Sequence, residues 1–274
     1  MATVAGNFEI RERRPDNLSG TPRAHSVDRW IFVGMALWFI LIVLVGFVPD
    51  SMMKLGMIKA GMRPPFPLVL HLHALLMGSF LLLLLAQTVM VATGRCGLHK
   101  QVGIAAFLLV PALVVVGLIL APTMYYQVWG GAKFGPPPVR EALAPVVPLV
   151  ENILLLQISG GLLFALFMGI ALGARTNRPG LHKRIIFLAT AVPIEAAIDR
   201  MFWLPSTMPA APLSGQMFVL LAVAPMLVWD VLRNRRVHEA YKVWLAVFLP
   251  VIALVNLAWD KPWWHAAAQR IMGV

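Results

Sequence analysis

The chain has 274 residues, of which 59% are apolar and only 13% are charged. A soluble domain has about a quarter of its residues charged, so this composition excludes an ordinary soluble protein. Apolar runs long enough to cross a bilayer recur along nearly the whole chain, and they predict an all-α, polytopic membrane helix bundle. The single cysteine, Cys96, excludes an intramolecular disulfide framework and a multi-cysteine metal cluster.

Seven transmembrane helices are predicted from these runs. They cover Trp30–Val48, Leu68–Ala92, Val102–Ala121, Val146–Leu172, Ile185–Trp203, Leu213–Leu232 and Tyr241–Leu257. Residues 1–29 are polar and no small-residue cleavage site follows the first span, so they are interpreted as a retained cytoplasmic tail. Residues 30–274 are expected to form a single transmembrane domain. Within it, the long connection Pro122–Pro145 contains the run FGPPPVREALAP, whose prolines are expected to keep the chain from continuing as helix.

The net charge of +11 is divided unevenly between the two sides of this predicted bundle. The tail and the connections after the second, fourth and sixth spans hold fifteen Lys and Arg residues, whereas the other side holds seven. By the positive-inside rule, the N-terminus is predicted to be cytoplasmic and the C-terminus external. The basic charge therefore indicates topology in a lipid bilayer, and we expect a protein of the bacterial inner membrane with no nucleic-acid partner.

A phrase of eight residues occurs twice, as TGRCGLHK in Thr93–Lys100 and as TNRPGLHK in Thr176–Lys183. Each copy lies where one apolar run ends and another begins. The second to fifth spans are therefore predicted to form two hairpins in the same orientation, which is a parallel pseudo-repeat. Gly97 and Gly180 are expected to allow the tight reversal of the chain.

The repeat places one histidine at the same depth in each hairpin, His99 in the first and His182 in the second. Three interpretations are open for this pair. The two side chains are interfacial polar groups at helix starts, or they are the axial ligands of a b-type haem, or they contact lipid or a partner protein. Their position at the very edge of the spans favours the first interpretation.

The stretch from His71 to Gly103 resembles a signature of uncharacterised bacterial polytopic membrane proteins, written H-x-H, then Gln, then G-R-x-x-L-H-[KR]-x-x-G. The matching positions are His71, His73, Gln87, Gly94, Arg95, Leu98, His99, Lys100 and Gly103. That resemblance implies membrane placement and no particular activity. Helical hairpins with histidines near both faces are also similar to cytochrome b561-type membrane electron carriers, which implies electron transfer. The predicted fourth span departs from that plan because it contains no histidine.

Ionisable residues inside the predicted spans form a second set of candidate site residues. Each costs about 2.5–3.5 kcal/mol on insertion scales, so its presence in a span indicates a structural or functional role. At about 1.5 Å of rise per residue, the set lies at one level near the external boundary. Its members are His71, His73, Glu151, Glu195, Asp199 and Arg200. Glu195 and Asp199 are four residues apart and project from one helix face. The two histidines are two residues apart, so we expect only one of them to reach a shared site. The two hairpins differ at this external end, which favours specific chemistry there.

Three interpretations compete for this external set. In the structural one, Arg200 pairs with Glu151, Glu195 or Asp199 and fastens the helices. In the second, the set holds a redox group, because carboxylates and imidazoles on bundle helices ligate iron, copper or zinc. In the third, the same acids and histidines carry protons or substrate.

The leading hypothesis is a membrane-bound redox protein, an oxidoreductase in the enzymatic case, that binds haem b or a non-haem metal in the external half and receives electrons from quinone. The candidate metal ligands are His71, His73, Glu151, Glu195 and Asp199. The candidate haem ligands are His71, His73, His99 and His182, and the candidate catalytic residues are Glu195, Asp199 and Arg200. A proton-coupled transporter and a non-catalytic subunit of a larger membrane complex are the alternatives. Asp230, Asp260 and Lys261 lie at span ends and are expected to be solvated.

Overall fold

The computed structural model describes residues 16–274, which are helical and contain no strand. Residues 1–15 of the predicted tail lie outside the described residues. The helices in chain order are α1 (Ser26–Lys59), α2 (Leu68–Ala92), α3 (Cys96–Val102), α4 (Ala106–Phe134), α5 (Pro137–Leu143), α6 (Val147–Ala174), α7 (Pro179–Ile198), α8 (Leu213–Asn234), α9 (Glu239–Ala258) and α10 (Pro262–Met272).

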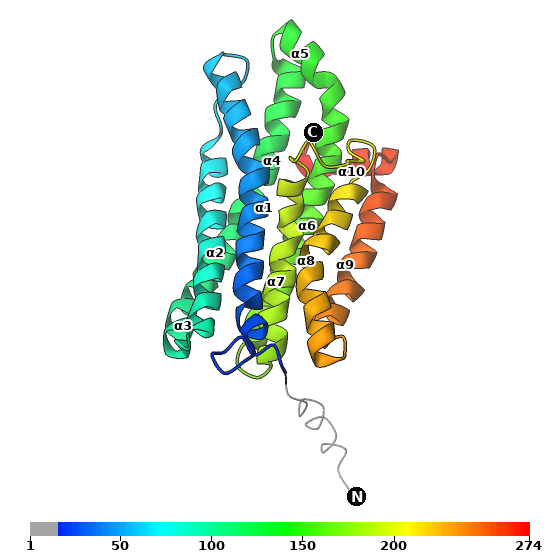
Figure 1. Cartoon of the computed structure of the whole chain (residues 1–274). Helices are drawn as coiled ribbons and strands as arrows, with labels where there is room; N and C mark the ends of the chain where they lie inside the picture. Colours follow the sequence, from blue (N-terminus) through cyan, green and yellow to red (C-terminus); the bar gives the residue numbers. More distant parts are fainter. Residues whose placement is uncertain (1–15) are drawn as a thin grey trace, which may run out of the picture.

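The long helices run side by side in one bundle, with α7 in the middle and the short helices α3, α5 and α10 near its ends (Figure 1). We call the end that carries the α2–α3, α6–α7 and α8–α9 connections the repeat end, because both copies of the repeated phrase lie there. The opposite end, with the α1–α2 and α7–α8 connections and with α5, is the far end. Alternate connections therefore lie at the same end, as the hydropathy pattern predicts.

Six helical segments of the described chain are long and apolar enough to cross a membrane: α1, α2, α3–α4, α5–α6, α8 and α9. This confirms an all-helical membrane bundle. Helix α7 has 20 residues but is not among the six. It carries Lys183, Arg184 and Glu195, which interrupt its apolar sequence. The sequence therefore identifies α7 as a helix, but its ionisable residues set it apart from the other long helices.

The predicted spans match the helices best where no proline intervenes. Helix α2 begins and ends at the predicted residues. The predicted span end at Ala121 is wrong, because α4 continues through Pro122 to Phe134. The helix does stop before the run of prolines that follows Gly135, and α5 begins within that run at Pro137. Proline is tolerated in the first turn of a helix, where its missing N–H has no intrahelical acceptor, and inside membrane helices that find other partners for the freed carbonyl. Helix α10 is absent from the prediction, since its eleven residues are too few and too polar for a span.

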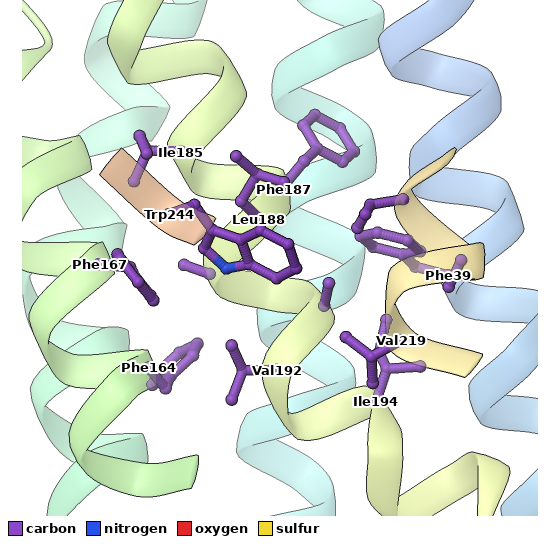
Figure 2. Close-up of a cluster of buried hydrophobic side chains, with 14 of the residues drawn as sticks. Phe39, Phe164, Phe167, Ile185, Phe187, Leu188, Val192, Ile194, Val219 and Trp244 are labelled. Carbon is purple, nitrogen blue, oxygen red and sulfur yellow. The ribbon is translucent and has the colours of Figure 1, made fainter. Parts of the chain in front are cut away.

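The core of the bundle is built around α7, of which twelve of the twenty residues are buried. Apolar side chains of α1, α6, α8 and α9 pack against it. Figure 2 shows Trp244 of α9 beside Leu188 of α7, with Phe164 and Phe167 of α6 nearby. Each such side chain contributes about 1.5–3 kcal/mol when it leaves water. In a bilayer, where lipid replaces water, close packing contributes instead.

The backbones of α1 and α7 approach each other closely at Gly46. A Cβ atom added to Gly46 would lie 2.7 Å from the carbonyl carbon and 2.9 Å from the Cα of Ala197. Both atoms belong to the backbone, so no side-chain rotation could relieve the overlap. The absence of a side chain at Gly46 therefore sets the spacing between α1 and α7, as small residues do between membrane helices.

A buried ion network fixes the repeat end. The guanidinium of Arg184 is 0% exposed and uses all five N–H groups. It donates to the carboxylate of Asp230, to both oxygens of Asp16 at 2.9 Å, and to the carbonyl of Gly180 at 3.0 Å. The prediction that Asp230 is solvated is therefore wrong, because this carboxylate is 0% exposed. Burial alone would raise the pKa of Asp16, but hydrogen bonds and charge from Arg184 and Lys183 lower it well below its ordinary value.

The first copy of the repeated phrase turns at a different glycine from the one expected. Gly94 has φ of +80°, in the left-handed region that favours glycine, and it follows the end of α2 directly. Gly97 lies inside α3 and Gly180 inside α7, where neither makes the reversal. The expectation for these two glycines is therefore wrong, and the second copy reverses the chain without a positive-φ glycine.

We predict that Gly46→Ala destabilises the protein by about 1–3 kcal/mol, because overpacking forces α1 away from α7. The measurement is thermal or denaturant unfolding of the purified protein in detergent. Gly34→Ala is the matched control on the same helix, since nothing lies within 4 Å of its added Cβ. That control should be neutral or stabilising by up to about 1 kcal/mol. Equal stability of the two variants would contradict the packing argument.

Candidate functional site

The five residues predicted to bind a metal at the far end do not form one site. Within residues 16–274, no group of three or more His, Cys, Asp or Glu side chains is arranged to hold a metal ion. The five come instead from three separate environments, on α2, on α6 and at the end of α7. Depth along the helix axis was predicted from residue counts, but the direction in which each side chain points was not.

The two histidines of α2 differ in their surroundings, as their spacing predicts. His71 is exposed and lies edge-on to the ring of Phe66, with 6.1 Å between ring centroids. His73 is partly buried, and its Nδ1 is a buried atom without a hydrogen-bond partner. Helix α2 contacts α1 and α4. His73 is therefore the histidine of α2 that faces the bundle.

Glu151 belongs to a network with α10 that the sequence did not suggest. Its carboxylate is 2% exposed, contacts Nδ1 of His265 at 2.6 Å and accepts from Gln269 Nε2 at 2.9 Å. Nε2 of His265 lies 3.2 Å from Asp260. The backbone carbonyl of Glu151 accepts from the indole of Trp264 at 2.9 Å. These contacts fasten α10 to α6, which is a structural role for Glu151.

Glu195 and Asp199 do lie together, as their spacing predicts. Both pack against the start of α8 at Gly215, where an added Cβ would lie 3.1 Å from Glu195 Cγ and 3.2 Å from Asp199 Cγ. Oε1 of Glu195 is buried without a hydrogen-bond partner. A cavity of about 10 Å³ beside Asp199 and Ser214 has room for a single water. Burial raises the pKa of Asp199 to about 6, and the charge of Arg200 limits the rise.

Arg200 forms its ion pair with a residue outside the predicted set. Its Nε lies 3.3 Å from a carboxylate oxygen of Asp50 on α1, and its guanidinium stacks over Phe47 at 4.5 Å. Asp50 also pairs with Lys54 at 2.6 Å. The structural interpretation named Glu151, Glu195 and Asp199 as partners, but the geometry gives Asp50. Arg200 therefore joins α7 to α1.

The larger cavity lies at the repeat end, between α1, α2, α3 and α7, and it contains both histidines of the repeated phrase. We call it the histidine cavity; its volume is about 220 Å³. Its lining residues are Ser19, Gly20, Arg29, Phe32, Leu84, Gln87, Thr88, Val91, His99, Arg175, Pro179, His182, Lys183, Ile186 and Phe187. The repeat therefore brings two imidazoles to one cavity, whereas the far end was expected to hold the chemistry.

Three cationic side chains line the same cavity. Arg29 donates through Nε to the carbonyl of Ala92 at 2.7 Å, and Arg175 donates through Nη1 to that of Leu172 at 3.0 Å. Neither forms an ion pair with another residue in the range 16–274. Lys183 pairs with Asp16 at 2.7 Å. The cavity thus combines two imidazoles with two guanidiniums whose charge has no acidic partner among the described residues.

The two imidazoles are held by different groups at Nδ1. His182 Nδ1 lies 2.8 Å from the carbonyl oxygen of Ala171 at the end of α6. His99 Nδ1 lies 2.5 Å from the side-chain amide of Gln87 on α2. Each ring is therefore tied to the helix that precedes it in its own hairpin. Both Nδ1 atoms are engaged in this way, so Nε2 is the nitrogen of each ring left for a ligand.

The sequence did not suggest the cationic lining of the histidine cavity. Arg175 and Lys183 were interpreted as topology signals, and Arg29 as part of a polar tail. A signal was nevertheless present, because Lys183 directly follows His182 and belongs to the repeated phrase. Arg29 reaches the cavity only because the start of α1 packs beside the end of α2, which no local pattern shows.

No protein-family model, curated protein or solved structure matches the chain.

We predict that Asp199 makes the stability of the folded protein fall as the pH rises from about 4 to about 6. Its folded-state pKa of about 6 exceeds the ordinary value of about 3.9. The folded state therefore binds an extra proton in that window, and its advantage is lost as the pH rises. Asp199→Asn should flatten this part of the stability profile measured by unfolding at several pH values. Glu141→Gln, which changes an exposed carboxylate of α5, is the control, and an unchanged profile in Asp199→Asn would refute the assignment.

Proposed function

We propose that the protein is a membrane-embedded electron carrier that binds haem b in the histidine cavity. The observation that carries the proposal is that His99 and His182, the histidines of the duplicated phrase, line one cavity. Two imidazoles are the axial ligand set of many b-type haems. This moves the proposed cofactor from the far end to the repeat end.

The chemistry of the lining fits haem in three respects. His182 has Nδ1 beside a backbone carbonyl, an acceptor that leaves the Nε2 lone pair for a metal, as is usual for metal-bound histidines. Arg29, Arg175 and Lys183 offer positive charge for two propionates. Phe32, Leu84, Val91, Ile186 and Phe187 offer an apolar surface for the macrocycle.

When bound, haem b supplies a one-electron couple whose potential depends on its axial ligands and their hydrogen bonds. His99 and His182 would hold the group. The apolar lining would exclude water, and the guanidinium of Arg175, which also stacks over Phe107 at 4.8 Å, would remain in place beside the cavity. The residues of the chain would therefore bind and orient the haem and neutralise the charge of its propionates.

The proposal includes a topology. We infer that α7 is a seventh span, that the repeat end faces the cytoplasm of a bacterium, and that the C-terminus is external. Support comes from the Lys and Arg residues of the connections at the repeat end and from the direction of α7 in the bundle (Figure 1). In this orientation the histidine cavity lies at the level of the inner leaflet, where a membrane quinol could deliver electrons.

We predict that the purified protein carries haem and that His99→Ala and His182→Ala each lose most of it. The measurements are the visible absorption spectrum and a pyridine haemochrome assay, with unfolding to establish that the variants are folded. His25→Ala is the control, because His25 is exposed and forms no side-chain cap on α1. A folded protein without haem, which also fails to bind added hemin, would rule the proposal out.

A proton-coupled transporter is the second candidate, and one observation favours it. Glu195 has a buried carboxylate oxygen without a partner beside Asp199, so the two acids could share and pass on a proton. We predict on this alternative that Glu195→Gln or Asp199→Asn abolishes pH-driven substrate flux in proteoliposomes. Glu141→Gln should leave flux unchanged, and full flux in both acid variants would exclude the transporter.

A further inference from the structure

The side-chain amide of Gln87 on α2 lies within hydrogen-bonding distance of His99 and Gly103. This amide spans the junction at which α3 ends and the 3₁₀ turn 103–105 begins. Only one of the two orientations of the amide satisfies its neighbours. With the amide oxygen toward Gly103, the backbone N–H of Gly103 donates to it at 3.0 Å, and the amide nitrogen donates to the carbonyl of His99 at 3.0 Å and to Nδ1 of the same residue at 2.5 Å. All the polar atoms of the amide are satisfied in this orientation.

This orientation decides which nitrogen of His99 carries the proton. An Nδ1 atom that accepts a hydrogen bond has no proton, so in the neutral ring the proton is on Nε2. His182 is the opposite case, because the carbonyl of Ala171 can only accept and therefore requires a proton on Nδ1. The two histidines occupy equivalent places in the repeat, yet one should offer an N–H and the other a lone pair.

We propose that Gln87 is a positioning residue that sets the tautomer of His99, so that the histidine cavity of the haem-free protein presents one N–H and one lone pair at the two Nε2 atoms. The proposal rests on the proposed function for the identity of the ligand and on the hydrogen bonds of Gln87 for the tautomer. A metal requires the lone pair of both Nε2 atoms. Haem binding therefore requires the Gln87 amide to turn over.

Turning the amide over would cost free energy, because two of its hydrogen bonds would be lost. Its NH₂ group would face the N–H of Gly103, and its oxygen would face the carbonyl of His99, so two satisfied contacts would become repulsive. Glutamate at this position has only acceptors when ionised. Gln87→Glu should therefore favour the proton on Nδ1 of His99 without any rotation and leave Nε2 ready to bind a metal.

The first test is the tautomer itself in the full-length, haem-free protein. Nitrogen-15 NMR of labelled histidine at pH 8, where an ordinary imidazole is neutral, distinguishes a protonated from an unprotonated ring nitrogen. Signals of His99 are assigned by their loss in His99→Ala. We expect the proton on Nε2 in the parent protein and on Nδ1 in Gln87→Glu. A proton on Nδ1 in the parent, or no change in a folded Gln87→Glu, would overturn the proposal.

The second test is hemin titration of the same haem-free proteins, followed by absorbance. Gln101→Glu is the matched control. Gln101 is exposed on α3, and its replacement adds the same negative charge two residues from His99. We expect Gln87→Glu to bind hemin about tenfold more tightly than Gln101→Glu, within the range that second-layer partners of metal ligands exert. Equal affinities would overturn the role assigned to Gln87 in haem binding. If no variant binds hemin, the proposed function fails, while the NMR result still decides the tautomer.

Discussion

The burial of Arg184 is the constraint on which the rest of the bundle depends. A guanidinium cannot remain charged inside a packed helix bundle unless its donors are satisfied and its charge is balanced. Asp230 of α8 and Asp16 of the segment before α1 provide both conditions. The same interaction therefore joins α7 to α8 and to the N-terminal segment. Removing one partner of such a group costs about 3–5 kcal/mol, because a buried charge is left alone.

The same network shapes the histidine cavity. Lys183 precedes Arg184 in α7, pairs with Asp16 and lines the cavity, so one carboxylate serves both residues. Ser19 and Gly20 follow Asp16 in the chain and form part of the cavity wall. Leu18, which lies between Asp16 and Ser19 in the chain, is fully buried. The ion network and the candidate ligand site are therefore two parts of one structure at the repeat end.

The sequence predicts the helices well and the partners of their polar residues poorly. Helix α2 is found residue for residue, because an apolar run between a proline and a threonine-glycine turn has clear limits. The depth of His99 and His182 follows from the repeat. The partners of Glu151 and Arg200 do not follow, because His265 and Asp50 are contributed by distant segments whose rotation about the helix axis no residue count gives. Helix α1 also packs against both α2 and α7, so equal depth did not bring His73 into one site with Glu195.

The buried charge of α7 has a consequence for the order in which the helices of the bundle assemble. Arg184 lies near the start of α7, at the repeat end, and is 0% exposed. Arg184 meets Asp230 only when α8, the next helix to be synthesised, stands beside it. The charge of Arg184 on α7 is therefore balanced from α8 only after both helices are in place. The two helices should therefore reach their native packing as one unit during folding.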